Sequence, residues 1–189
     1  MTIAFLVLVA VVVLWVVGAY NGLIALKNQT ANAWKQIDVQ LKRRHDLIPN
    51  LVNAVKGQMD FEKSTLEAVI SARAKAVGAT GVAATARAEG ELSQALGKLF
   101  ALAENYPDLK SSANVLQLQE ELSSTENKIG FARQLYNDVA TQYNTRQAQF
   151  PTNLVAGLTK ATPSELWEIT DAVERQVPTV DLSLNRPAS

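Results

Sequence analysis

The apolar residues of this chain form one continuous block followed by a long series of periodic stripes. Residues 3–17 are all apolar, and the uncharged stretch continues to Leu26, just before the first lysine, Lys27. At 1.5 Å of rise per residue, about 20 residues cross a hydrocarbon core of roughly 30 Å. The block therefore predicts an N-terminal transmembrane helix.

A cleaved signal peptide is the alternative interpretation of this block. Val17 and Ala19 are small residues at the −3 and −1 positions of such a cleavage site. A signal peptide begins with a basic segment, however, and no Lys or Arg precedes this apolar run. A retained anchor is the favoured interpretation, and cleavage stays open.

The basic residues after the block predict the orientation of the chain. Five basic residues lie within about 20 residues of its end, and Asp38 opposes them; the five are Lys27, Lys35, Lys42, Arg43 and Arg44. Basic residues are enriched on the cytoplasmic side of membrane helices. We therefore expect the amino terminus outside and the body of a single-pass protein in the cytoplasm, whereas cleavage would export the body.

After Lys27 the chain shows helical periodicity almost throughout. Apolar residues first recur every seven positions in a stripe that comprises Trp34, Leu41, Ile48 and Val55 and resumes at Val69 and Ala76. This stripe predicts one helix that ends where Gly78 and Gly81 turn the chain, followed by a second helix over residues 82–105. Pro49 removes a hydrogen bond from the first helix and predicts either a kink or a restart.

The clearest periodicity follows Pro107, which predicts the end of one helix and the start of the next. The third helix has a heptad seam of Val115, Leu122, Ile129, Tyr136, Tyr143 and Phe150. Phe150-Pro151 ends it. A capping-box sequence, with Thr162 as N-cap and Glu165 at the third helical position, predicts a short fourth helix that stops before Pro178.

These patterns together predict an all-α fold. An N-terminal transmembrane helix precedes an elongated antiparallel bundle of about four helices with coiled-coil character. The expected units are an anchor with its membrane edge at residues 1–26, a bundle at residues 27–176 and a flexible tail at residues 177–189. No run of alternating β-branched residues predicts a strand.

Composition restricts the chemistry. The 18 basic and 18 acidic residues cancel, so we expect no nucleic-acid partner. The absence of cysteine and the single histidine, His45, exclude thiolate zinc sites and multi-histidine metal sites. Carboxylate-bridged metal sites in helical bundles use a Glu-x-x-His spacing, which this sequence lacks. We therefore interpret six glutamates as solvated, namely Glu89, Glu91, Glu104, Glu120, Glu121 and Glu126. We expect no catalytic, cofactor-binding or metal-binding residues.

The most suggestive polar cluster consists of Lys42, Arg43, Arg44, His45 and Asp46. Binding of anionic lipid is disfavoured, because Arg44 lies about 27 Å along a straight helix from Leu26 and attraction fades over about 8 Å. Pairing with acidic residues of a neighbouring helix is the favoured interpretation. Docking of a protein partner is the main functional alternative.

A second candidate surface comprises Tyr136, Tyr143 and Phe150 on the third helix. That helix spans about 54 Å, whereas the second spans about 36 Å and cannot cover all of it. An exposed apolar patch on an anchored protein predicts self-association, so a homo-oligomer is expected. A monomer would result if the fourth helix folded back over the seam.

Several motifs resemble those of one bacterial family. They are Tyr20-Asn21, the block AWKQIDVQLKRRHDLIPNLVNAVKG at residues 33–57, Tyr106 to Leu109, Leu118 to Leu122, Tyr136-Asn137, Tyr143-Asn144 and Phe150-Pro151. Over nearly its whole length the chain resembles the LemA family. The resemblance implies an antiparallel helical bundle anchored in a bacterial inner membrane. It implies no enzymatic activity or ligand.

Three classes of function follow from these features. A membrane-anchored scaffold or adaptor that binds protein partners is favoured, because helix faces and the anchor are the strong signals. A sensor that transmits a conformational change along its helices is the alternative, supported by the discontinuity at Pro49. An enzyme is disfavoured, since no nucleophile, base and electrophile fall into a recognisable pattern.

Overall fold

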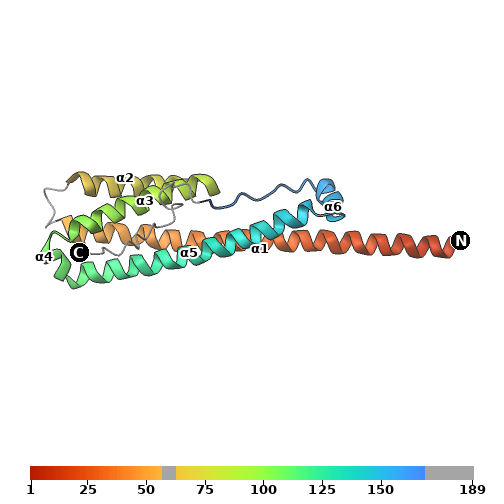
Figure 1. Ribbon diagram of the computed structural model, residues 1–189, viewed down its shortest axis with the longest axis horizontal. Helices are drawn as coiled ribbons and strands as arrows, with labels where there is room; N and C mark the ends of the chain where they lie inside the picture. The colour runs from red at the N-terminus through yellow and green to blue at the C-terminus, as the bar shows by residue number, and fades with distance from the viewer. Residues whose placement is uncertain (57–62, 169–189) are drawn as a thin grey trace, which may run out of the picture.

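The computed structural model describes residues 1–56 and 63–168, and its helices run back and forth along one long axis (Figure 1). The helices are α1 Thr2–Lys56, α2 Lys63–Gly78, α3 Val82–Ala103, α4 Pro107–Ser111, α5 Ala113–Ala148 and α6 Thr152–Leu158. No strand occurs within the two described ranges. α1 pairs with α5 and α2 pairs with α3, each pair antiparallel, so the predicted all-α bundle is confirmed.

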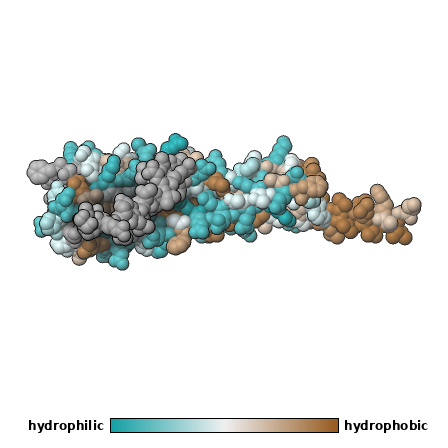
Figure 2. Space-filling model, viewed as in Figure 1, coloured by the Kyte–Doolittle hydropathy of each residue, from teal (hydrophilic) through white to brown (hydrophobic). Residues whose placement is uncertain are grey.

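α1 is much longer than the body, and its N-terminal part projects from it. Its 55 residues correspond to about 80 Å of helix. The projecting part is brown in the hydropathy colouring of Figure 2, and only 6% of its most apolar 18-residue window is buried. A core helix of such composition would be covered by its neighbours. By length and composition, α1 is a candidate membrane helix.

The buried stripe of α5 follows the predicted heptad seam. It comprises Val115, Leu122, Thr125, Ile129, Ala132, Tyr136, Ala140, Tyr143 and Gln147. The facing stripe of α1 includes Ile37, Leu41, Ile48 and Val55, as the sequence predicts. Phe150 is the exception, because α5 ends at Ala148 and leaves this ring exposed.

The predicted turns at Gly78–Gly81 and at Pro107 are confirmed in outline. α2 ends at Gly78, α3 begins at Val82, and Gly81 between them has a φ of 85°, which glycine adopts without a Cβ penalty. Pro107 begins the short helix α4, and the long helix α5 follows at Ala113.

The prediction of a single helix between residues 27 and 78 is wrong. α1 ends at Lys56, and a separate helix, α2, begins at Lys63 and runs back along the body (Figure 1). Val69 is buried on α2 in the same core as Val55 of α1. The apolar residues keep the same spacing of seven before and after the break. Because this spacing does not indicate the direction of a helix, it could not reveal the reversal.

α1 continues through Pro49 without ending, so the predicted restart is wrong. Proline has no N–H to donate to the carbonyl of His45, four residues earlier. Arg73 of α2 replaces this donor, since its Nε–H donates to the His45 carbonyl oxygen at 2.7 Å. A residue of the neighbouring helix therefore satisfies the acceptor that the proline leaves open.

The predicted fourth helix does not begin at Thr162. Residues 161–168 are non-helical and run back from α6 along the body (Figure 1), while the short α6 was not predicted. The remainder of the predicted helix, residues 169–176, and the predicted tail, residues 177–189, lie outside the described residues.

Two asparagines of α5 hold this segment in its extended form. Asn144 binds the backbone of Ser164, donating from Nδ2 to the carbonyl at 2.9 Å and accepting from the N–H at 2.8 Å. Asn137 binds Trp167 in the same two-point manner, at 2.9 and 2.8 Å. These bonds use the backbone groups that a helix would need, so tertiary contacts override the capping box.

Trp167 closes the seam that the short α2–α3 pair leaves open. Its buried ring lies 5.9 Å from that of Trp34, which in turn meets the ring of Tyr136 edge-on at 5.3 Å. Tyr136 and Tyr143 are both buried inside the chain. The predicted self-association surface is therefore wrong for these two tyrosines, because α1 and residues 161–168 cover them.

We expect Arg73→Met to destabilise the fold by about 1–3 kcal/mol, the cost of a buried acceptor without its partner. Pro49→Ala restores a main-chain donor for His45, so the cost of Arg73→Met should shrink in that background. A double-mutant cycle of thermal unfolding, on the full chain in detergent, measures this coupling. Additive effects of the two substitutions would contradict the replacement of the proline's donor by Arg73.

Candidate functional site

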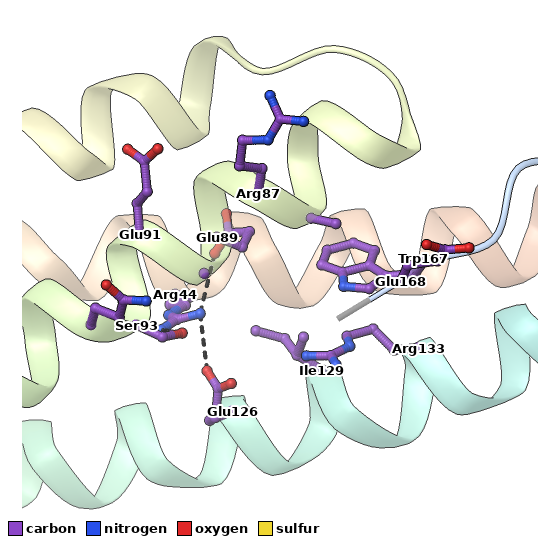
Figure 3. A pocket seen from close by; sticks show the side chains of 13 residues that line it. Arg44, Arg87, Glu89, Glu91, Ser93, Glu126, Ile129, Arg133, Trp167 and Glu168 are labelled. Carbon is purple, nitrogen blue, oxygen red and sulfur yellow. Dashed lines mark hydrogen bonds and ion pairs between the residues drawn. The ribbon is translucent and has the colours of Figure 1, made fainter. Parts of the chain in front are cut away.

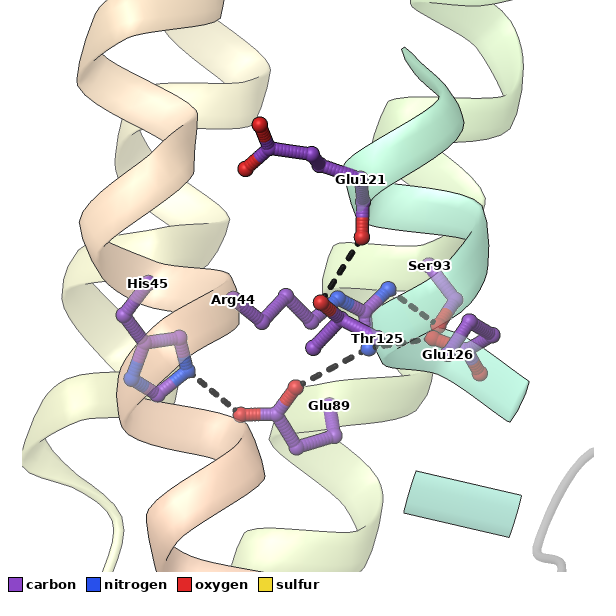
Figure 4. Close-up of polar contacts among 7 residues, drawn as sticks. All are labelled: Arg44, His45, Glu89, Ser93, Glu121, Thr125 and Glu126. Carbon is purple, nitrogen blue, oxygen red and sulfur yellow. Dashed lines mark hydrogen bonds and ion pairs between the residues drawn. The ribbon is translucent and has the colours of Figure 1, made fainter. Parts of the chain in front are cut away.

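A cluster of buried charged side chains joins α1, α3 and α5 near the middle of the body (Figure 4). Nη1 of Arg44 lies 3.2 Å from Oε2 of Glu89 and 2.9 Å from Oε2 of Glu126. Nη2 of Arg44 donates to the Ser93 hydroxyl at 2.8 Å. Nε2 of His45 lies 2.6 Å from the other oxygen of Glu89.

Glu89 is the centre of this cluster. Its carboxylate places one oxygen on each of two successive residues of α1, Arg44 and His45. The side chains of Arg44 and Glu89 are 5% and 4% exposed, whereas that of Glu126 is 45% exposed. A buried charge needs a close partner to offset lost hydration, so the contact with Glu89 is what permits Arg44 to lie in the core.

The helix divides the predicted docking cluster into two sets. Arg44 and His45 point inward and are buried, so they are not available for docking. Lys42 and Asp46 are exposed and form an ion pair with each other at 3.1 Å, and Arg43 is exposed as well. The favoured pairing with a neighbouring helix is thus confirmed for the two buried residues.

The interpretation of Glu89 as a solvated residue is wrong. A signal for its burial was present in the sequence, because the spacing of Leu92, Leu96 and Leu99 extends backwards by three and four residues to Glu89 and Thr85. Both of these polar residues are buried on α3. Polarity alone suggested an exposed face, and the helical phase pointed to the core.

A cavity of about 460 Å³ lies beside the cluster (Figure 3). Arg44, Glu89 and Glu126 form its charged wall, and Trp167 lies at the other end beneath the guanidinium of Arg133, 5.3 Å from the ring centroid. Both basic and acidic side chains line it, so the cavity has no single sign of charge. No group of three or more His, Asp or Glu able to hold a metal ion occurs in the described part of the chain.

The chemistry of the cluster is that of a clamp between helices. An ionised Glu89 accepts hydrogen bonds from both α1 side chains. The Ser93 hydroxyl accepts a hydrogen bond from the guanidinium of Arg44. A guanidinium stays protonated and cannot act as a general base to activate this hydroxyl. These contacts stabilise the packing and supply no activated nucleophile.

Two side chains have shifted pKa values, Asp38 of α1 and Tyr136 of α5. Burial raises the pKa of the Asp38 carboxyl above its usual range. Burial, together with the nearby Glu165 carboxylate, raises the pKa of the Tyr136 hydroxyl. Tyr136 therefore stays neutral at physiological pH and keeps its hydrogen bond to the Glu165 carbonyl, 2.7 Å away.

A shallower groove of about 470 Å³ lies on the α1–α5 pair, away from the buried cluster. Its lining includes Val39, Phe131 and Leu135, which are 63%, 74% and 43% exposed. Gln40 also lines it, and the buried Oε1 of this residue has no hydrogen-bond partner within the described ranges. An aromatic and aliphatic surface with an open acceptor is typical of an interface.

The two carboxylates of the cluster should differ in importance. We expect Glu89→Ala to cost about 3–5 kcal/mol, since it leaves Arg44 buried without its charge partner. Glu126→Ala is the matched control, and we expect it to cost about 1 kcal/mol or less because Glu126 is half-exposed. Thermal unfolding of the full chain in detergent, followed by circular dichroism, compares the two. Equal losses would contradict the central role of Glu89.

The sequence of the chain is similar to those of known proteins. The model of the LemA family matches residues 33–182. Protein LemA of Metamycoplasma hominis is 32% identical over 142 residues, which cover 74% of this chain and 64% of that protein.

Magnetosome protein MamQ 2 of Paramagnetospirillum magneticum is 24% identical over 175 residues, covering 79% of this chain and 64% of the relative. Magnetosome protein MamQ of Magnetospirillum gryphiswaldense is 24% identical over 166 residues, covering 74% and 61%. The chain thus spans less than two thirds of the length of these curated relatives. Because the family model covers most of the bundle, including the buried cluster, the chain belongs to the LemA family.

Proposed function

We propose that this protein is a membrane-anchored helical scaffold that binds protein partners and has no catalytic activity. The projecting apolar part of α1 supports the anchor. Its side chains are exposed, and this part of the helix is long enough to cross a bilayer. The buried polar groups support a structural role, because they pair with one another across helices. The proposed setting is a bacterial inner membrane with the body in the cytoplasm.

The observation that carries partner binding is the groove on the α1–α5 pair. Two antiparallel helices present Val39, Phe131 and Leu135 to solvent in one concave surface. This geometry suits an amphipathic helix whose apolar face lies in the groove. Lys35 and Lys128 line the groove, so a partner helix with acidic residues beside its apolar face is complementary.

Self-association stays a prediction that the same groove can test. A second copy placed symmetrically over the groove would bring the same two lysines towards each other. A different protein with an acidic-flanked helix is therefore the favoured occupant, and a second copy is the other outcome.

We expect a photo-reactive phenylalanine analogue at Phe131 to form adducts with a partner in native membranes. The same analogue at Val77, exposed on α2 and outside the groove, is the matched control and should form few. Mass spectrometry of the adducts distinguishes a partner helix from a second copy of this chain. Equal adduct formation at the two positions would contradict docking in the groove.

A sensor that transmits conformational change is the second candidate. The observation that favours it is the joining of three helices at Arg44, because a shift of α1 would be transmitted directly to Glu89 of α3 and Glu126 of α5. A variant of the cluster that retains its partners and loses downstream output would favour the sensor over the scaffold.

The proposed orientation places Ser124, exposed on α5, in the cytoplasm. The chain has no native cysteine, so a membrane-impermeant maleimide reports on Ser124→Cys alone. We expect labelling only after the inner membrane is permeabilised, whereas Thr2→Cys should be labelled in intact cells. Labelling of Ser124→Cys in intact cells would contradict the orientation.

A further inference from the structure

The end of the body from which the apolar part of α1 emerges carries a second exposed apolar surface. Phe150, Leu154 and Leu158, here called the basal patch, are 79%, 59% and 83% exposed. Figure 1 places α6 at this end, and brown atoms gather there in Figure 2. Leu154 and Leu158 are four residues apart on α6, so they share one face of the helix.

α6 is fixed against α1 rather than hanging free. Its residues Val155 and Ala156 are buried in a core that also contains Ala19 and Leu23 of α1 and Tyr143 of α5. The position of the basal patch along α1 is therefore set by this packing. The patch lies at the level where the uncovered, apolar part of α1 meets the body.

Helix geometry places this level at the surface of a bilayer. A hydrocarbon core of roughly 30 Å takes about 20 residues of helix, so a span that begins at Ile3 ends close to Gly22. The α1 residues that hold α6, Ala19 and Leu23, lie on either side of that limit. The basal patch is consequently at the boundary between acyl chains and headgroups.

The charges around the basal patch have one sign. No Asp or Glu occurs among residues 1–37 or 139–164. Arg146 and Lys160 are exposed and lie within four residues of the patch in sequence, and exposed Lys27 follows by four residues Leu23 of α1, which packs in the same core as α6. Basic residues beside an apolar surface at this depth match a leaflet that contains anionic lipid.

We propose that α6 and Phe150 form a second membrane contact, in which the basal patch inserts at the headgroup boundary and these basic residues face anionic lipid headgroups. The proposal rests on the proposed membrane anchor. Lipid is the occupant, because α6 packs on Ala19 and Leu23 at bilayer depth, and their sequence neighbours Tyr20 and Ile24 are exposed as well. The contact would fix the tilt of the body relative to the membrane, because the body would be attached at two points rather than by one helix.

Depth-dependent quenching of single fluorescent probes tests this contact. Leu158→Cys, Leu116→Cys and Leu8→Cys are each labelled with an environment-sensitive dye in the full chain. The variants are then reconstituted in phosphatidylcholine vesicles that contain phosphatidylglycerol. Leu158 is in the patch, Leu116 is the matched exposed leucine at the start of α5, far from the membrane, and Leu8 is the mid-span reference. All three side chains are exposed, so the probes leave the packing intact.

We expect lipid-borne quenchers to act on the Leu158 probe severalfold more than on the Leu116 probe, and iodide in the water to act on it less. If lipid-borne quenchers act on the Leu8 probe but act on the Leu158 probe no more than on the Leu116 probe, the basal contact is overturned. The membrane anchor is then still supported. Absence of lipid quenching at Leu8 would overturn the anchor, and the contact with it. Protection of Leu158 from iodide without lipid quenching would show that a second copy covers the patch, which also overturns the proposal.

The role of the charges is tested by Lys27→Gln, Arg146→Gln and Lys160→Gln together. With the native residues, we expect lipid quenching at Leu158 to fall when phosphatidylglycerol is replaced by phosphatidylcholine. In the triple variant this dependence on anionic lipid should disappear. Equal quenching of the native protein in both kinds of vesicle would overturn the recognition of anionic headgroups.

Discussion

One turn of α1 connects most of the body. The carbonyl of His45, which Pro49 deprives of a helical donor, accepts from Arg73 of α2. The side chains of Arg44 and His45 on the same turn reach Glu89 of α3, and Arg44 reaches Glu126 of α5. Four helices therefore meet at a single level, and the carbonyl that Pro49 leaves without a helical donor accepts a hydrogen bond from the neighbouring helix. Since an unpaired group there would be buried, this level restricts how the helices can shift against one another.

A mismatch of helix lengths leaves part of the α1–α5 pair uncovered by the other two helices. α5 has 36 residues, while α2 and α3 have 16 and 22, so the shorter pair covers only part of the α1–α5 pair. The segment at residues 161–168 fills one uncovered stretch, with Trp167 packed on Trp34. The groove at Phe131 and the patch on α6 stay open. The patch on α6 lies beyond the α2–α3 pair, whereas the groove is lined by α1 and α5 alone, on a face to which that pair contributes no residue.

These surfaces lie at different heights above the expected membrane. The basal patch is level with the end of the apolar part of α1, and the groove near Val39 is further along the same helix. A bundle that pairs Arg44, His45 and Glu89 in its interior and exposes apolar surfaces on the α1–α5 pair and α6 is suited to contacts with helices and lipid. The LemA family model matches residues 33–182, a range that includes the residues of the buried cluster and the two asparagines of α5.

The sequence by itself determined the apolar block and the seam of α5, because side-chain periodicity within one helix is a local property. It also contained the phase that buries Glu89 on α3. Only the tertiary structure decided that the chain reverses between Lys56 and Lys63, since a stripe of the same phase can belong to one helix or to two antiparallel ones. It likewise decided that Thr162 starts no helix, because Asn137 and Asn144 of α5 bind the backbone of the segment that follows. Contacts between residues distant in sequence made both choices, and local pattern does not record them.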